Sequence, residues 1–258
     1  MAIRADVPLK IGGDVSRCPT CGHPVRIVFR DGKHADHYEP IMGHDFNMLL
    51  PIDKLTAKKL RKDRNGKKTV ALVGMANTSC SLAPYNESGV EVWGLNEEHS
   101  FAWMQSWDRW FQAHKPDAFT RDTNPHRAHE RGYVKGHYGW LKQKHYKPIY
   151  MQYLYPEIPD SVEYPLTKIV ERFFPKIGRG DEKIKYFTST FAYMMALALF
   201  EKYERIEIYG FEMAAGDEFA PQKSCAEFWI GYALGMGVEI YLPPKSQLIW
   251  GPLYGYQE

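Results

Sequence analysis

The chain has 258 residues, of which 44% are apolar and 25% charged, and its 33 Lys and Arg against 31 Asp and Glu give a formal net charge of +2. This composition is ordinary for a globular protein with a sizeable core, and it excludes a wholly disordered chain. No apolar run reaches the roughly 18 residues that a membrane helix needs, and the opening segment lacks the apolar stretch of a secretory signal, so we expect a cytoplasmic protein.

Cysteine and histidine residues near the start of the chain form a pattern close to that of a tetrahedral zinc site. Two cysteines separated by two residues are followed by two histidines, and the sequence around the cysteines is rich in turn residues. Such sequence favours a structural metal over a redox pair, which belongs on a thioredoxin-like unit. We therefore predict a small zinc-knuckle-like module over residues 1–50. Its expected zinc ligands are Cys18, Cys21, His34 and His37, with His23 and His44 as alternatives.

A run rich in Lys and Arg separates this module from the rest of the chain. Residues 54–68 carry eight Lys and Arg and a single acid, Asp63, and Asn65-Gly66 within the run is a turn signal. We place a basic linker at 51–67 and a larger domain at 68–258. In that domain Cys80 and Cys225 have no partner pattern and are expected to be ordinary buried thiols.

From residue 68 onward, short apolar runs alternate with helical patterns. Strands are predicted at 69–74, 90–95, 108–114, 148–151, 205–210 and 238–242, and helices at 164–174, 190–203 and 224–236. The second helix is apolar almost all round and is expected to be buried. The pattern predicts an α/β fold: a Rossmann-like parallel sheet with helices on both faces, preceded by the small module. Ligands of such sheets bind outside the carboxyl ends of the strands.

Small polar residues follow the first two predicted strands. Gly74 ends the first strand, and Asn77, Thr78 and Ser79 after it can present hydroxyls and amides to a phosphate at a helix N-terminus, with Asn96 at the end of the second strand. Gly74 would let the backbone approach the ligand closely. A plain strand-to-helix turn is the alternative.

A second group precedes the buried helix predicted at 190–203. Three hydroxyl residues stand here: Thr188, Ser189 and Thr190. Any one of them can cap the helix, which leaves the other two available for a phosphate above its N-terminus. Simple capping is the alternative.

Candidate catalytic groups follow later strand ends. Glu212, with Asp217 and Glu218 in the next loop, suits ribose hydroxyls, a divalent ion or base catalysis, unless the loop is merely a solvated acidic segment. His114, after the third strand, is a candidate acid or base, or a structural histidine. Whether a divalent metal acts there is left open.

Residues 119–147 form a second basic stretch, in which aromatic rings are interleaved with seven Lys and Arg. This pattern suits a nucleic acid backbone with splayed bases, and equally a mobile lid over a negatively charged donor or a solvated insertion.

The strand-end motifs resemble a known group of proteins. Two pairs of segments resemble sialyltransferase-like proteins and their DUF115-like, Rossmann-type glycosyltransferase relatives. The first pair is Val73–Ser79 with Val92–Asn96, and the second is Thr188–Thr190 with Ile206–Glu212. Asp108–His114 also looks like a segment of uncharacterised phage-encoded proteins. The resemblance implies a nucleotide-sugar donor. It places Gly74, Asn77, Thr78, Ser79 and Asn96 along the donor, Ser189 and Thr190 at its phosphate, and Glu212 at the family's acidic position.

The function that follows is that of a nucleotide-sugar-dependent glycosyltransferase-like enzyme. A base among His114, Glu212, Asp217 and Glu218 would deprotonate an acceptor hydroxyl, which attacks the anomeric carbon while phosphate leaves toward Ser189 and Thr190. The zinc pattern and the stretches 54–68 and 119–147 make modified DNA a candidate acceptor, for a phage-encoded enzyme acting in the host cytoplasm. The alternatives are a non-catalytic nucleotide-binding protein and a nucleotide-processing transferase or hydrolase.

Overall fold

The computed structural model of the chain describes residues 15–17, 24–29, 35–40, 66–120, 136–174, 178–179, 182–213, 219–244, 246–251 and 255. The chain divides into two compact units, Met1–Pro51 and Ile52–Glu258.

The first unit contains a three-stranded antiparallel sheet of β1 (Val15–Arg17), β2 (Pro24–Phe29) and β3 (Ala35–Pro40). His37, one of the predicted zinc ligands, is on β3 opposite Val28 of β2. The other predicted ligands and their alternatives, Cys18, Cys21, His34, His23 and His44, lie outside the described residues. Within the described part of the chain there is no group of three or more His, Cys, Asp or Glu that could hold a metal ion. The zinc site therefore stays a prediction.

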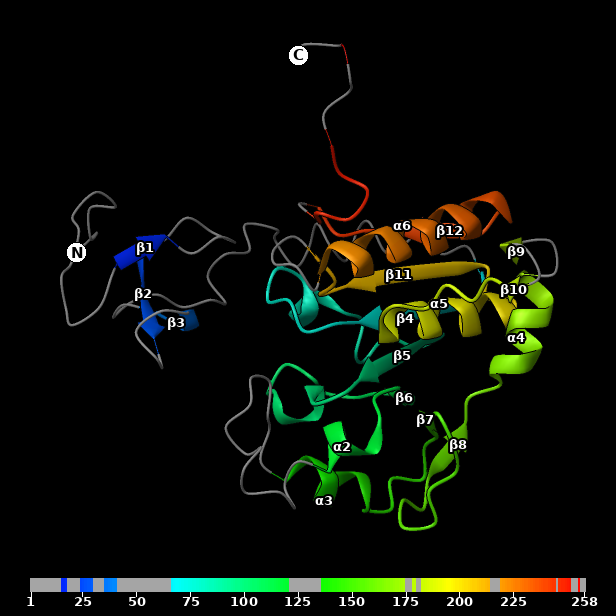
Figure 1. Ribbon diagram of the computed structural model, residues 1–258, viewed down its shortest axis with the longest axis horizontal. Helices are drawn as coiled ribbons and strands as arrows, with labels where there is room; N and C mark the ends of the chain where they lie inside the picture. Colours follow the sequence, from blue (N-terminus) through cyan, green and yellow to red (C-terminus); the bar gives the residue numbers. More distant parts are fainter. Residues whose placement is uncertain are drawn as a thin grey trace. The chain divides into compact units, whose positions relative to one another are not determined.

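The second unit is built on a seven-stranded sheet in the order β12-β11-β4-β5-β6-β7-β8, in which every neighbouring pair is parallel (Figure 1). Its strands are β4 (Thr69–Val73), β5 (Val90–Leu95), β6 (Arg109–Gln112), β7 (Ile149–Met151), β8 (Ser161–Glu163), β11 (Arg205–Tyr209) and β12 (Glu239–Tyr241). From β4 the chain builds outward to β8 and then returns to add β11 on the other side of β4. The strand order therefore reverses between β4 and β11, which is the topological switch point of a doubly wound, Rossmann-like sheet.

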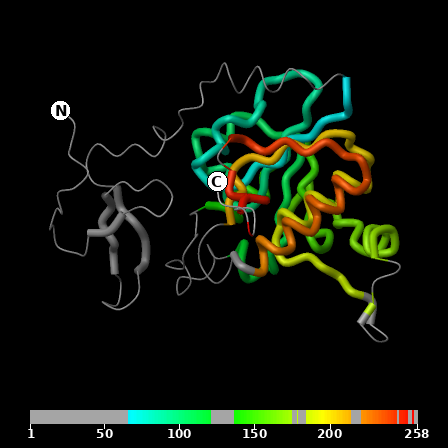
Figure 2. The backbone as a smooth tube through the Cα atoms, turned by 90° about the horizontal axis from the view of Figure 1, so that it is seen from above, coloured from blue at the N-terminus to red at the C-terminus, as the bar shows by residue number. Residues whose placement is uncertain are grey.

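The helices of the second unit connect these strands. They are α2 (Pro116–Phe119), α3 (His137–Leu141), α4 (Leu166–Phe173), α5 (Thr190–Phe200) and α6 (Phe219–Gly235), with 3-10 helices η3 (Cys80–Leu82) and η4 (Glu98–Ser100). A short antiparallel hairpin, β9 (Gly178–Arg179) with β10 (Glu182–Lys183), precedes α5. Helices α5 and α6 lie side by side in both views (Figure 1, Figure 2). Among the described residues, no helix combines the length and the apolar character needed to cross a membrane.

The two faces of the sheet carry separate cores, because successive side chains of a strand point in opposite directions. Trp93 and Phe111 belong to the larger core, with the apolar residues of α4, α5 and α6. Trp110 and Ile149 belong to the smaller core, with Phe119 of α2 and Leu141 of α3. The helices thus cover both faces, as the sequence predicts.

Each strand and helix predicted above by its residue range is present, whereas the α-helix expected after the turn at Gly74–Ser79 is not. Helix α6 begins earlier than expected, at Phe219, and the strand β8 and the helices α2 and α3 were not predicted.

Candidate functional site

The polar residues that follow the strands gather at the carboxyl edge of the sheet. There Gly74 follows β4, Asn96 follows β5 and Gly210 follows β11. Because α5 leads into β11, which is parallel to the other strands, the N-terminus of α5 lies at the same edge. Ring packing of Phe191 in α5 against Phe211 after β11, with centroids 4.7 Å apart, is consistent with this placement. We call these strand ends together with the N-terminus of α5 the strand-end site.

Gly74 and Gly210 bring the ends of β4 and β11 into direct contact. The N–H of Gly74 donates to O of Tyr209 and the N–H of Ala76 donates to O of Gly210, both at 2.8 Å. A Cβ on Gly74 would lie 2.5 Å from O of Gly210, and a Cβ on Gly210 would lie 2.1 Å from O of Gly74. Glycine is therefore required at Gly74 for the approach of two loops. The expectation that it is there to admit a ligand has no support from this packing.

Ser79 also serves this junction. Its side chain is buried, and its Oγ accepts a hydrogen bond of 2.8 Å from the N–H of Gly210. The segment that follows is the three-residue 3-10 helix η3, so the expected α-helix after this turn is absent and its dipole cannot serve a phosphate. Of the residues predicted in this loop, Asn77 is exposed and Thr78 is half-buried.

Glu212 connects three segments of the strand-end site. Its Oε1 accepts a hydrogen bond of 2.6 Å from the hydroxyl of Thr78, and its Oε2 accepts one of 2.6 Å from the N–H of Gln247. The structure thus brings together two predicted site residues, Thr78 and Glu212. Both carboxylate oxygens are engaged by the protein, which suits a positioning role better than that of a base.

Asn96 presents a buried polar atom without a partner. Its backbone is held in the left-handed region at φ 48°, with its N–H donating to O of Phe111 and its carbonyl accepting from the indole of Trp110. The side chain is 9% exposed, and its Oδ1 accepts no hydrogen bond from the described residues. A strained conformation of this kind costs about 1–3 kcal/mol and is often found at binding sites.

Ser189 presents a second such atom. It is the N-cap residue of α5, but its side chain makes no capping hydrogen bond, and its buried Oγ has no partner among the described residues. Simple capping by Ser189, the alternative given above, therefore does not occur. Thr190 beside it is buried, whereas the hydroxyl of Thr188 donates to O of Pro221 at 3.0 Å.

His114 lies two residues beyond β6 and belongs to a chain of hydrogen-bonded side chains. Nδ1 of His114 is 3.4 Å from Nε2 of Gln112, whose Oε1 is 3.1 Å from Nε2 of His137. Nδ1 of His137 is in turn 2.9 Å from Nε2 of His99. Sequence reasoning missed Gln112, His137 and His99, although a glutamine at a strand end two residues before a histidine is a readable signal.

Glu98 is another residue of this edge that sequence reasoning missed. It is fully buried, its Oε2 accepts a hydrogen bond of 2.9 Å from the N–H of Leu95, and its Oε1 has no partner among the described residues. Burial raises the pKa of Glu98 well above its ordinary value.

Other predicted features fall partly outside the described residues. Asp217 and Glu218 do so, as do residues 54–65 and 121–135 of the two basic stretches. In the described part of the second stretch, Trp140 stacks on the ring of His99 with centroids 4.1 Å apart, so its face is already covered. Cys80 and Cys225 are free and buried, and burial raises the pKa of Cys80 to about 12, which keeps the thiol inert.

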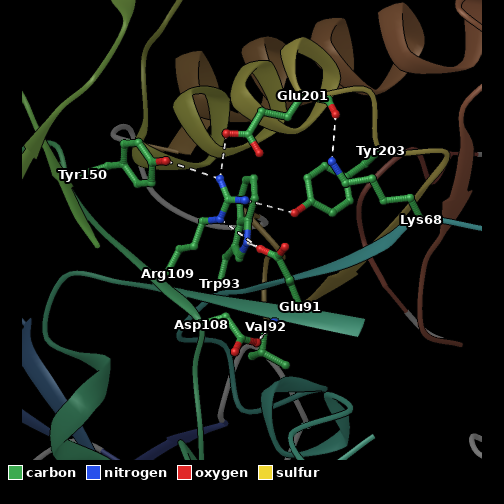
Figure 3. Close-up of polar contacts among 9 residues, drawn as sticks. All are labelled: Lys68, Glu91, Val92, Trp93, Asp108, Arg109, Tyr150, Glu201 and Tyr203. Atoms are coloured by element: carbon green, nitrogen blue, oxygen red, sulfur yellow. Dashed lines mark hydrogen bonds and ion pairs between the residues drawn. The ribbon is translucent and has the colours of Figure 1, made fainter. Parts of the chain in front are cut away.

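The amino edge of the sheet contains a cavity of about 320 Å³ lined by Lys68, Glu91, Tyr203 and neighbours, and Glu91 is ion-paired with Arg109 (Figure 3). Arg109 donates to Glu91 at 2.9 Å and to Glu201 at 2.7 Å, and it lies over the ring of Trp93. Ion pairs of this kind hold α5 and two strands together. They leave the strand-end site as the stronger candidate for ligand binding.

No protein-family model and no curated protein sequence matches the chain. Solved structures of a sialyltransferase are similar to it. The sialyltransferase CstII from Campylobacter jejuni with cytidine-5'-monophosphate has 13% identity and a TM-score of 0.41, covering 70% of this chain and 82% of that one. The same enzyme with CMP-3FNeuAc has 15% identity and a TM-score of 0.42 over the same shares. The enzyme with a trisaccharide acceptor and CMP has 16% identity and a TM-score of 0.39, covering 70% and 83%. These values assign no residue role, so the site is argued from this chain alone.

Proposed function

We propose that the chain is a nucleotide-sugar-dependent glycosyltransferase whose donor binds at the strand-end site. One observation supports this most: two buried polar atoms, Oδ1 of Asn96 and Oγ of Ser189, have no partner among the described residues, and both lie at the carboxyl edge of a doubly wound sheet. A buried polar atom left unpaired costs about 1–3 kcal/mol, which a ligand hydrogen bond would remove. Ligands of such sheets bind at this edge. The choice of a nucleotide sugar rests on the sequence resemblance given above.

The roles of the residues follow from their positions. Ser189, at the N-terminal end of the α5 dipole, would receive the phosphate as the bond from the anomeric carbon to the phosphate oxygen breaks. Asn96 would accept a hydrogen bond from a hydroxyl of the donor. The acceptor oxygen loses its proton to a base and forms the new glycosidic bond, while the electron pair of the broken bond goes to the departing nucleotide. The base is one of His114, Glu212 and Asp217.

A thermal-shift assay on the full chain tests donor binding. The ligands are CMP, UDP and GDP, each free and as a sugar conjugate, at about a hundred times their dissociation constants, where one bound ligand adds about 2.7 kcal/mol. A larger shift with one sugar nucleotide than with its bare nucleotide, and release of that nucleotide on addition of an acceptor, would support the transferase. Binding of a bare nucleotide with no product would instead indicate a nucleotide-binding protein.

Ser189→Ala sharpens this test. The hydroxyl has no partner in the described structure, so its removal should leave the melting temperature of the free protein unchanged or raise it. If it meets the phosphate, the variant should bind the donor about 10- to 150-fold more weakly, since a hydrogen bond to a charged group is worth about 1.5–3 kcal/mol. Thr188→Val is the matched control, because that hydroxyl already bonds O of Pro221. Equal donor affinity in both variants would remove Ser189 from the site.

The acceptor is tested separately. A saccharide and duplex DNA are offered side by side at low and at raised salt, since phosphate contacts make DNA binding strongly salt-dependent. Transfer to the saccharide alone would end the DNA hypothesis.

A further inference from the structure

The turn that follows β12 carries two exposed apolar residues on a strained backbone. Ile249 is 52% exposed, and its φ of 53° lies in the left-handed region that a β-branched residue rarely adopts. Trp250 is 68% exposed, and among the described residues it has no hydrogen-bond or ring-packing partner. Strain of this kind persists only where the surrounding structure imposes it, and it is concentrated at ligand clamps and binding sites. The turn is therefore a candidate binding surface.

Hydrogen bonds and burial hold this turn next to the strand-end site. The N–H of Gln247 donates to Oε2 of Glu212 at 2.6 Å, and the N–H of Leu248 donates to Oγ of Ser246 at 3.3 Å. The side chain of Leu248 is buried in the larger core. Trp250 follows Gln247 by three residues, so its Cα lies within about 11 Å of that anchor. The exposed indole is thus presented beside the strand-end site.

The order of the strands places this indole on one side of the expected phosphate. The strands at this edge follow one another as β12, β11, β4 and β5. Trp250 comes after β12, Asn96 after β5, and Ser189 begins the helix that leads into β11, between the two. In doubly wound sheets a polar residue about 20 residues after the first glycine turn meets the ribose, and Asn96 follows Gly74 at that spacing. A nucleotide sugar with its ribose at Asn96 and its phosphate at Ser189 directs its sugar toward Trp250.

We infer that the indole of Trp250 stacks on the apolar face of the sugar that the donor transfers, and that Ile249 is a positioning residue of this contact. The inference rests on the proposed function, because it names the part of the nucleotide sugar that the turn contacts. One face of a sugar ring presents C–H groups and is apolar, whereas the hydroxyls lie around its rim. A flat, rigid indole matches such a face and loses little conformational entropy on binding.

Calorimetric titration of the full chain tests the contact, with the sugar nucleotide of the panel that stabilises the protein most and with its bare nucleotide. Trp250→Ala should bind the sugar nucleotide about tenfold more weakly and the bare nucleotide as wild type does, because only the sugar meets the indole. Trp250→Phe keeps a flat apolar ring and should lose about threefold or less. Since the indole is exposed, both variants should melt within about 2 °C of wild type.

Tyr146→Ala is the matched control. Tyr146 is also an exposed aromatic residue with a left-handed backbone, at φ 59°, but it precedes β7 and therefore lies toward the amino edge of the sheet. Its removal should change the affinity for neither ligand. A loss for the sugar nucleotide in Tyr146→Ala as large as in Trp250→Ala would show that the effect is not local to the turn, and it would overturn the inference.

The indole N–H signals in NMR spectra give a second readout, taken on the wild-type protein. The chain has seven tryptophans, and the signal that disappears in Trp250→Phe is that of Trp250. A saturating amount of the sugar nucleotide should shift this signal, and the bare nucleotide should not. A Trp250 signal that stays unchanged in the saturated complex would overturn the inference without reference to any variant's affinity.

The outcomes separate this inference from the proposed function. Equal affinity of the wild type for the sugar nucleotide and the bare nucleotide would overturn the sugar contact, and so would equal losses for the two ligands in Trp250→Ala. In both cases the nucleotide still binds at the strand-end site. A wild-type protein that binds neither ligand would refute the proposed function, and the sugar contact with it.

Discussion

Replacing Gly210 with alanine measures how closely β4 and β11 meet at the strand-end site. Gly210 has φ +67°, a conformation that costs an L-residue about 1–2 kcal/mol. A Cβ there would also lie 2.1 Å from O and 2.7 Å from the carbonyl carbon of Gly74, which are backbone atoms and cannot rotate away. Overpacking of this kind adds about 1–3 kcal/mol. Gly237 is the matched control, because its φ is +78° and nothing lies within 4 Å of its Cβ position.

Both variants carry the backbone cost, so the difference between them isolates the contact with Gly74. For a unit of this size, 1 kcal/mol corresponds to about 2–4 °C, and Gly210→Ala should therefore melt about 2–12 °C below Gly237→Ala in differential scanning calorimetry. Gly74→Ala should share the larger loss, since its Cβ would lie 2.5 Å from O of Gly210. Equal melting temperatures for Gly210→Ala and Gly237→Ala would refute the close approach of the two strand ends.

Three further predictions concern charged groups. Glu212→Gln should keep kcat/KM within about tenfold if Glu212 only holds Thr78 and Gln247, whereas a loss of about a hundredfold or more in the same steady-state assay would identify it as the base. Glu98→Gln should raise the melting temperature at pH 8 but not at pH 4. The pKa of Glu98 in the folded state lies above its ordinary value of 4.5, so the folded state holds a proton that the unfolded state releases. The stability of the wild type therefore falls as pH rises above about 4.5, and glutamine removes this loss. A pH-independent effect would contradict this sign. Arg109→Met leaves Glu91 and Glu201 without their shared cation, and it should lower the free energy of unfolding in urea by about 1–3 kcal/mol. The loss is smaller than for a fully buried pair because both carboxylates are partly exposed. Arg109→Lys cannot reach both carboxylates and should restore only part of this stability; full restoration would show that one ion pair suffices.

The sequence predicts the parts of the fold that rest on burial. Strand β4 is buried at every position, and its unbroken apolar run is visible in the sequence. Strand β8 could not be found in this way, because it is a three-residue edge strand whose side chains are partly or fully exposed. Helix α3 could not be predicted either. It begins after Gly136 at φ 86° and has only five residues, which are too few to show a helical period in the sequence.

The position of the candidate site follows from topology, whereas its contacts do not. Asn96, Ser189 and Glu212 were singled out because they flank predicted strands and a helix, and a parallel sheet brings such positions to one edge. The partners of Ser79 and Thr78 lie 131 and 134 residues away, so no local pattern could show that Ser79 braces Gly210 or that Thr78 bonds Glu212. Glycine at a strand end looks the same in a sequence whether it admits a ligand or a neighbouring loop. Only the path of the chain distinguishes the two.

The two edges of the sheet differ in how their polar groups are satisfied. At the amino edge, Arg109 donates hydrogen bonds to two carboxylates and two tyrosine hydroxyls, so its charge is neutralised by groups of the protein itself. At the carboxyl edge, three buried side-chain oxygens have no partner in the described part of the chain: those of Asn96, Glu98 and Ser189. A fourth, the hydroxyl of Tyr155, lies in the connection between β7 and β8. Since an unpaired buried oxygen costs stability, these three oxygens favour the carboxyl edge over the amino edge as the place where we expect a ligand. The Ser189→Ala substitution is the most direct test of this reasoning. A hydroxyl that binds a ligand changes donor affinity when it is removed, whereas a hydroxyl that stabilises the fold changes the melting temperature.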